Sequence, residues 1–180
     1  MWEQSDMTIL LIADILDGEL NLDQTSKALT AARRLGKVTV LCASSNCDQA
    51  IEQISALEGV SEVLVSDSEI YKKSLAEPLS ELIASIGKNY SHILAPATAL
   101  GKNVLPRAAA LLDVMIISDC TDIISEDTFE RPIYAGNALQ IVRSSDAIKV
   151  CTIRTANFGI SLAGANKAEI KNIAPNTDPK

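Results

Sequence analysis

Four residues near the middle of the chain have the types and the spacing of an anion site. The apolar run 92–97 leads into Thr98. Three more residues follow before a stretch with a helical apolar stripe, namely Gly101, Lys102 and Asn103. The first turn of a helix offers free backbone N–H groups and a partial positive charge, and a lysine adds a full charge. These four residues are therefore candidates for holding a phosphate or another small anion.

The motifs that would make such a site specific are missing from the sequence. A phosphate loop needs an upstream glycine and a hydroxyl residue after the lysine, and "GKN" has neither. A dinucleotide fingerprint would follow the first strand, but "DILDGEL" stands there, and Asp14 and Asp17 would repel phosphate. The alternative is structural: Gly101 makes a turn, and Asn103 caps a helix that has Pro106 in its first turn. We favour this alternative.

Catalytic and metal-binding chemistry find little support in the residue pattern. His92 is the only histidine, and it stands at the start of a predicted strand, whereas sites in parallel sheets form at the strand ends. The sequence has no GxSxG nucleophile motif, so we predict no catalytic residue. A cluster of acids matches no calcium loop, and acids in loops are mostly solvated, so we predict no metal site. Its members are Asp119, Asp122, Glu126 and Asp127.

The cysteines have no spacing typical of a metal site. Cys42 and Cys47 stand too far apart for a CxxC pair, and the remaining two, Cys120 and Cys151, do not complete a zinc set. Cys42 and Cys151 lie within apolar runs, where a buried and inert thiol is the usual case. We therefore expect reduced, structural cysteines.

The elements that would position these residues alternate regularly along the first part of the chain. Apolar runs predict strands near 8–14, 37–43, 61–66 and 91–97, and amphipathic helices separate them. Nearly continuous apolar strands are typical of a parallel sheet covered on both faces, which is a three-layer, Rossmann-like α/β fold. After residue 114 the strand-like segments are separated only by short polar turns, which predicts antiparallel or mixed strands added at an edge.

The winding of such a sheet decides where a ligand would bind. Ligands lie at the carboxyl ends of the strands, at the point where the strand order reverses. If the strand near 8–14 lies beside the strand near 91–97, both Asp14 and Thr98 line the crevice at that point. The candidate anion residues would then line one wall of the same crevice.

Two arginines stand out within the later strand-like segments. Arg131 and Arg143 flank apolar residues that include Ile133 and Tyr134. One interpretation places the arginines on a wet face of an antiparallel sheet, with the apolar residues pointing into the core. The other is a protein–protein contact with an apolar centre and a charged rim. Both interpretations are open from the residues alone.

Composition narrows the range of partners. The 180 residues include 16 Lys and Arg against 23 Asp and Glu, a net charge of −7, so nucleic acid is not an expected partner. Hydrophobic residues make up 47 % and aromatic residues only 3 %, which favours layered packing over stacking on bases. Apolar runs are too short for a membrane span or a signal peptide, so we expect a soluble, intracellular chain.

Several long stretches of the sequence share one resemblance. They read "NLDQTSKALTAARRLGKVTVLCA", "LEGVSEVLVSD", "HILAPATALGKNVLPRAAALLDVMIISD", "FERPIYAGNALQIVRS" and "KVCTIRTANF". In this order and spacing, over residues 8–158, they resemble the N-terminal domain of the electron transfer flavoprotein alpha subunit. The resemblance implies an adenine-nucleotide-hydrolase-like α/β fold. It also implies that the crevice of this domain is empty, since the beta subunit of the family holds AMP.

The function implied by the resemblance is that of an electron carrier and not of an enzyme. Such carriers are heterodimers of an alpha and a beta subunit with one FAD. They take electrons from acyl-CoA dehydrogenases of fatty acid beta-oxidation and from other dehydrogenases, and pass them to a quinone oxidoreductase. They work in the bacterial cytoplasm or in the mitochondrial matrix. Residues 129–143 would face the beta subunit and the flavin domain, which makes Arg131, Ile133, Tyr134 and Arg143 interface candidates.

The family holds its FAD mainly in a C-terminal alpha domain that opens with a Gly-Arg-Gly segment. This sequence contains no such segment. We therefore predict an α/β domain over residues 1–158 and a linker or tail toward a missing flavin domain over 159–180. The same departure predicts that this chain alone binds no FAD.

Two rival classes share the general fold. A universal-stress-like protein that binds adenine nucleotides needs a glycine-rich phosphate segment late in the chain, and the sequence lacks one. A ligase of the pyrophosphatase type needs an SGGxDS loop after the first strand, where "DILDG" stands. The first of these remains the alternative to an electron carrier.

Overall fold

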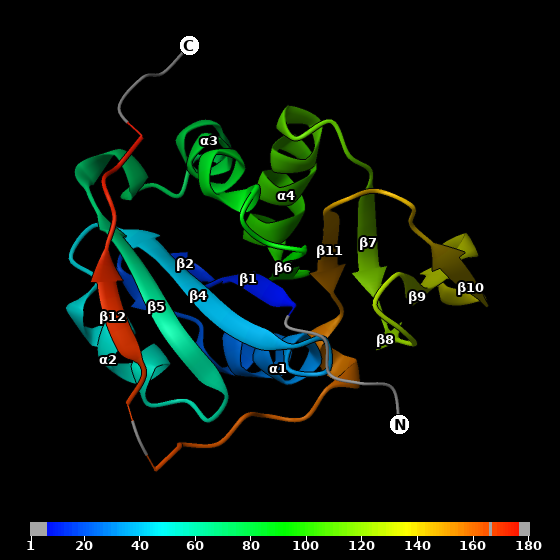
Figure 1. The fold of residues 1–180 in the computed structure, drawn as a ribbon, viewed down its shortest axis with the longest axis horizontal. Coiled ribbons are helices and arrows are strands. Elements are labelled where there is room, and N and C mark those ends of the chain that lie inside the picture. The colour runs from blue at the N-terminus through cyan, green and yellow to red at the C-terminus, as the bar shows by residue number, and fades with distance from the viewer. Residues whose placement is uncertain (1–6, 166, 177–180) are drawn as a thin grey trace.

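A seven-stranded parallel sheet forms the centre of the molecule (Figure 1). The computed structural model describes residues 7–165 and 167–176. The strands lie side by side in the order β12-β5-β4-β1-β6-β11-β7, and each neighbouring pair is parallel. Their bounds are Thr8–Ile12 for β1, Lys37–Ser44 for β4, Val60–Asp67 for β5, His92–Pro96 for β6, Ile116–Cys120 for β7, Lys149–Ile153 for β11 and Glu169–Asn172 for β12. The predicted parallel α/β sheet is confirmed.

Two pairs of helices cover the two faces of this sheet (Figure 1). Helices α1 (Leu22–Ala32) and α2 (Asp48–Ser55) pack on one face, and α3 (Ala76–Gly87) and α4 (Ala99–Leu111) pack on the other. Side chains along β1 point alternately to the two faces of the sheet. Leu11 packs in the core under α1, and Leu10 packs in the core under α3 and α4. Burial on both faces explains why the strands read as continuous apolar runs.

Strand β1 lies beside β6, which is the strand order that a crevice between the strands near 8–14 and 91–97 needs. Leu11 is opposite Leu94 in their parallel register. The chain runs from β1 outward through β4 and β5, and then returns across the sheet to β6. The strand order therefore reverses between β1 and β6, and the loops after these two strands meet at one edge of the sheet.

Helix α4 begins five residues earlier than the residue pattern suggests. Thr98 is the N-cap, with extended backbone angles and a side-chain oxygen that accepts the Gly101 N–H at 3.4 Å. The predicted cap at Asn103 is therefore wrong, and Asn103 and Pro106 lie inside the helix. Gly101 allows this start, because a Cβ at position 101 would clash with the carbonyl oxygen of Pro96 at the end of β6.

The strands after residue 114 divide between two sheets. Three of them, β8 (Asp122–Ile123), β9 (Thr128–Ile133) and β10 (Ala138–Arg143), form a separate antiparallel sheet, as predicted for this part of the chain. Strands β7 and β11 extend the central sheet beyond β6, as expected for addition at an edge, with β11 between β6 and β7. The expected antiparallel pairing is wrong for these two strands, because both join in parallel. The reason is burial: four of the five residues of β11 are buried, and the strand has neighbours on both sides.

The edge of the sheet beyond β5 is occupied by β12. This strand lies within the segment 159–180, for which a linker or tail was predicted. Lys171 of β12 forms an ion pair with Glu62 of β5, and the Asn176 N–H donates a hydrogen bond to the hydroxyl oxygen of Tyr71 at 2.8 Å. The domain division at 158 stays a prediction, and residues 177–180 of the tail lie outside the described residues.

Helices long and apolar enough to cross a membrane do not occur in the described part of the chain.

Candidate functional site

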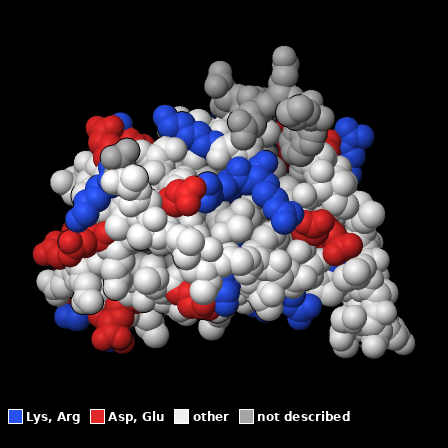
Figure 2. Space-filling model, turned by 90° about the horizontal axis from the view of Figure 1, so that it is seen from below, with Lys and Arg blue, Asp and Glu red and all other residues white. Residues whose placement is uncertain are grey.

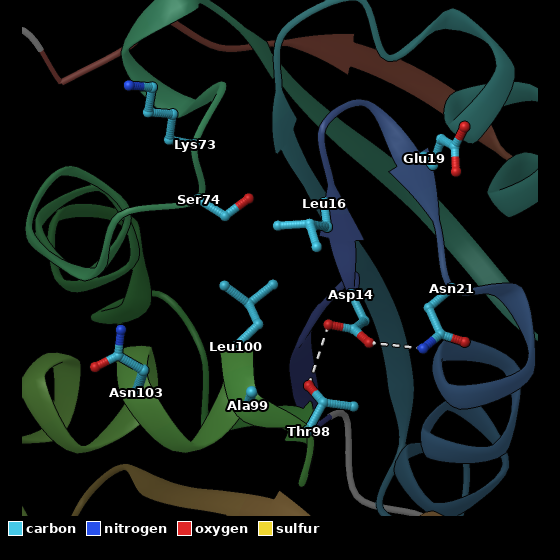
Figure 3. Close-up of a pocket in the computed structure, with 10 residues that line it drawn as sticks. All are labelled: Asp14, Leu16, Glu19, Asn21, Lys73, Ser74, Thr98, Ala99, Leu100 and Asn103. Carbon is cyan, nitrogen blue, oxygen red and sulfur yellow. Dashed lines mark hydrogen bonds between the residues drawn. The ribbon is translucent and has the colours of Figure 1, made fainter.

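The crevice between β1 and β6 brings Asp14 and Thr98 into contact. The Thr98 hydroxyl donates to one carboxylate oxygen of Asp14 at 3.1 Å, and the Asn21 side-chain amide donates to the other at 3.1 Å (Figure 3). Asp14 is half-buried. Burial raises its pKa above the usual 3.8, while the two hydrogen bonds act in the opposite direction. Asp14 and Thr98 thus line the crevice, as expected from the strand order, and the hydrogen bond between them is a finding of the structure.

A short hairpin forms the wall of the crevice opposite α4. Strand β2 (Ile15–Leu16) pairs with β3 (Glu19–Leu20) across a two-residue turn. Both turn residues, Asp17 and Gly18, have positive φ angles of 51° and 81°, as in a type I′ turn. The Asp-Gly pair in "DILDGEL" is the sequence signal for this hairpin, in addition to the glycine fingerprint that this segment lacks.

The crevice holds a cavity of about 390 Å³ with a mixed lining (Figure 3). The Ser74 hydroxyl ties the loop before α3 to the hairpin, because it donates to the Ile15 carbonyl oxygen at 2.9 Å. Two acidic side chains and one lysine supply the charge of the lining, which disfavours phosphate. The lining residues are Asp14, Leu16, Glu19, Asn21, Lys73, Ser74, Thr98, Ala99, Leu100 and Asn103.

The four anion candidates do not converge on this cavity. Thr98 and Asn103 line it, whereas Gly101 is buried under the first turn of α4. Lys102 points elsewhere: its ammonium nitrogen lies 3.8 Å from a carboxylate oxygen of Asp119. That carboxylate also lies 3.5 Å from Arg154, so Asp119 is shared between two cations. An anion site at these residues stays a prediction. Among the described residues, the cation in the cavity lining is Lys73, which the residue spacing does not indicate.

The acidic residues between 119 and 127 do not form one site. Asp122 pairs with Arg34 of the α1 end, and Asp127 pairs with Arg143 at 2.6 Å. Hydrogen bonds from Thr128, Arg143 and Ser125 hold the pKa of Asp127 well below its usual range. Among the described residues, no group of three His, Cys, Asp or Glu side chains is placed to hold a metal ion. The four cysteines are buried and free.

Charged side chains on the face that carries α1 and α2 lie in mixed neighbourhoods. Figure 2 shows this face from below, with the blue side chains near its middle bordered by red ones. Two exposed ion pairs on this side are Arg33 with Glu58 and Lys167 with Glu52. Such a face offers no extended basic field to a nucleic acid.

His92 links the small antiparallel sheet to the body of the molecule. It is buried at the start of β6, at the end of the strand away from Thr98. One ring nitrogen lies 2.9 Å from the Ser91 hydroxyl, and the other lies 2.7 Å from the backbone oxygen of Glu126. The ring also lies 6.2 Å from the Phe129 ring, centroid to centroid. This environment is that of a structural histidine.

The burial of His92 predicts a pH-dependent stability. Burial lowers its pKa from 6.5 to about 4, so the folded protein keeps the ring neutral where the unfolded chain protonates it. Unfolding then takes up a proton between pH 6.5 and about 4. The free energy of unfolding should fall in this window by up to about 1.4 kcal/mol per pH unit, and the contribution is fully present above pH 6.5.

The comparison with His92→Gln isolates this contribution, because glutamine does not titrate. In urea unfolding of both proteins from pH 4.5 to 7.5, the stability curve of the variant should be flatter below pH 6.5 by up to about 1.4 kcal/mol per pH unit, and parallel to that of the parent above pH 6.5. Parallel curves for the two proteins would contradict a buried neutral His92.

The apolar residues of the β9–β10 hairpin face solvent. Tyr134 is 85 % exposed, Leu139 62 % and Ile141 65 %, and Ile133 is also exposed. The interpretation that the apolar residues point into the core is therefore wrong for these four. Phe129 of the same sheet is fully buried, on the face opposite to Leu139 and Ile141. Strand pairing explains the exposure of Leu139 and Ile141, because alternate residues of β9 and β10 lie on opposite faces. Ile133 shares the face of Phe129 but stands at the end of β9.

The two arginines of this sheet differ in their surroundings. Arg131 is half-buried and donates from one terminal nitrogen to the Ser118 hydroxyl of β7 at 3.1 Å. Arg143 is exposed and bound to Asp127. A contact of this sheet with another protein stays a prediction.

Comparison with known proteins gives one consistent result. The model of the electron transfer flavoprotein domain family matches residues 10–178. The chain is 50 % identical over 173 residues to the electron transfer flavoprotein subunit alpha of Paracoccus denitrificans, which covers 96 % of this chain and 56 % of that protein. For the subunit alpha of Pseudomonas aeruginosa the identity is 46 % with the same coverage. The mitochondrial subunit alpha of Dictyostelium discoideum is 38 % identical over 91 % of this chain and 48 % of its own length. The chain thus spans about half the length of the curated relatives it matches.

Proposed function

This chain belongs to the electron transfer flavoprotein family, and we propose that it serves as the N-terminal scaffold of an alpha subunit. The family match extends over residues 10–178, nearly the whole chain. In this role the chain carries no catalytic residue of its own. Its α/β body presents the small antiparallel sheet to a beta subunit, and to a flavin domain supplied by the remainder of the assembly.

The redox chemistry in this proposal belongs to the whole protein. A heterodimer of alpha and beta subunits with one FAD would take electrons from acyl-CoA and other dehydrogenases and pass them to a quinone oxidoreductase. It would do so in the bacterial cytoplasm or the mitochondrial matrix. The β1–β6 cavity supports a scaffold role for this chain, since Asp14 and Glu19 line it with Lys73 and disfavour a phosphate-bearing cofactor. We therefore propose that FAD binds outside residues 1–180.

The observation that carries the proposal is the exposed apolar face of the β9–β10 hairpin. Leu139 and Ile141 project from the same face of β10, and Tyr134 stands at the tip. Large apolar side chains grouped on one surface are typical of a protein contact. In the sheet order β10-β9-β8, the outer edge of β10 is open among the described residues, so its backbone groups are also available to a partner.

Hydrogen exchange with and without the matching beta subunit tests this assignment. On formation of the heterodimer, amides within 129–143 should exchange at least about tenfold more slowly, because a covered edge strand opens less often. Helix α3 (Ala76–Gly87), which packs on the opposite side of the central sheet from α1 and α2, serves as the internal reference and should change little. A heterodimer that leaves exchange across 129–143 unchanged would show that the interface lies elsewhere. Failure of any heterodimer to form would overturn the scaffold role itself.

A further inference from the structure

Arg131 is a half-buried cation whose hydrogen bonds are incomplete. It extends from β9 toward the edge strand β7, where it donates to the Ser118 hydroxyl. Its Nε atom is buried and finds no acceptor among the described residues. The ion pairs found in the described part of the chain likewise include no carboxylate for Arg131. An unpaired guanidinium in a partly buried position is unfavourable. Because Nε is buried, the terminal nitrogens are the donors available to an acceptor from outside the chain.

A cavity of about 290 Å³ lies beside this guanidinium, between β7 and β10. Ile117 and Val142 give it apolar walls, and Met115, 73 % exposed, stands among its lining residues. A cavity of this size suits one amino-acid side chain and is small for a nucleotide cofactor. Its position beside an arginine with free donors makes it a receptor for a short, charged group.

The other charges of this cavity are already engaged within the chain. Arg143 is bound to Asp127 at 2.6 Å. The Asp146 carboxylate accepts the Met115 backbone N–H at 3.0 Å and the Ser144 hydroxyl at 3.3 Å. Asp146 keeps its negative charge, and Arg131 is the cation of this lining that has no ion pair among the described residues. The planar fork of a guanidinium matches a carboxylate with two parallel hydrogen bonds.

We propose that Arg131 is the specificity anchor of the partner contact, and that it binds the carboxylate of an Asp or Glu side chain inserted by the beta subunit between β7 and β10. This inference rests on the scaffold role proposed above and adds the residue and the chemistry of recognition. The exposed apolar side chain of Met115, which lines the same cavity as Arg131, favours a protein over a free small anion as the source of the carboxylate, because a protein also covers it.

Binding of the beta subunit to three variants tests the anchor. Arg131→Met removes the charge and should raise the dissociation constant about 30-fold or more, because it leaves the partner's carboxylate unpaired. Arg131→Lys keeps the charge but loses the fork, and we expect about a tenfold loss. The matched control is Arg107→Met on the exposed face of α4, which removes the same charge and should change the dissociation constant less than about twofold.

Thermal unfolding of the chain alone separates an anchor from a structural arginine. If Arg131 serves the partner, Arg131→Met should leave the unfolding temperature unchanged or raised, since an incompletely paired cation is replaced by an apolar side chain. Lower thermal stability with unchanged affinity would overturn the proposal, and so would equal losses of affinity in Arg131→Met and Arg107→Met. If Arg131→Met does not fold, the affinity of Arg131→Lys decides in its place.

A double-mutant cycle then identifies the carboxylate donor. Each acidic residue of the beta subunit is changed to alanine and measured against the wild-type chain and against Arg131→Met. One such change should weaken binding to the wild-type chain and have little effect on binding to Arg131→Met. Additive losses for every acidic residue would overturn the anchor while leaving the heterodimer intact. Absence of binding by the wild-type chain would overturn the scaffold role and the anchor together.

Discussion

Replacing Phe129 by alanine should lower the free energy of unfolding by about 4 kcal/mol and loosen the antiparallel sheet. Phe129 is fully buried, and it is the one residue of β9 classed as buried. Its ring contributes to the core on the α1 side of the central sheet and lies near the ring of His92. Truncation removes this packing and leaves a cavity that rigid strands cannot fill.

Replacing Phe129 should destabilise the small antiparallel sheet more than the rest of the protein. In urea unfolding the variant should lose stability, and amides of β9 and β10 should exchange faster than those of the central strands. Leu139→Ala is the matched control, since Leu139 lies on the opposite face of the same sheet and is mostly exposed. Its stability should change by less than about 0.5 kcal/mol. Equal losses in the two variants would contradict the assignment of inner and outer faces.

Gly101→Ala should destabilise the protein by about 3 kcal/mol, the reverse of what alanine does in an open helix. Replacing an exposed glycine inside a helix by alanine raises the free energy of unfolding by about 1 kcal/mol. At position 101 the new methyl group would meet the Pro96 carbonyl oxygen and the Ala95 side chain, so α4 would have to move away from β6.

Calorimetry measures the cost at Gly101 directly. For a chain of this length, a loss of about 3 kcal/mol corresponds to a fall in unfolding temperature of roughly 6–12 °C. Gly159→Ala is the control, since a Cβ there meets nothing within 4 Å among the described residues. It should leave the unfolding temperature within about 2 °C of the parent. A Gly101→Ala variant as stable as Gly159→Ala would show that α4 shifts without cost.

The strands of the first part of the chain could be predicted from the sequence, because burial of a strand on both faces requires an unbroken run of apolar residues. The strands β1, β4, β5 and β6 are buried on both faces, so their apolar runs are continuous and readable. The place of β11 between β6 and β7 could not be predicted in this way. Sheet order depends on which strand edges remain open when the chain returns, and a run such as "KVCTI" fits either an inner or an outer position.

The candidate site was predicted in part, for a similar reason. The reversal of strand order is enough to bring Asp14 and Thr98 together. The direction of Lys102 depends instead on the phase of α4, which the true cap at Thr98 fixes. Successive helical residues point about 100° apart, so Asn103 lines the cavity while Lys102 turns to Asp119. An error in the predicted cap position is therefore enough to give wrong directions for the side chains of Lys102 and Asn103.

The place of β11 also dictates the order in which a nascent chain can assemble. Among the described strands, β7 has one neighbour in the central sheet, and that neighbour is β11, which is made later. A chain that has left the ribosome only as far as β7 therefore holds β6 with one open edge and β7 with no place in the sheet. The three strands β8, β9 and β10 must also leave the ribosome before β11 can take its place between β6 and β7. Until β11 is made, the unpaired edge of β6 can bind a chaperone or pair wrongly with a strand of another nascent chain.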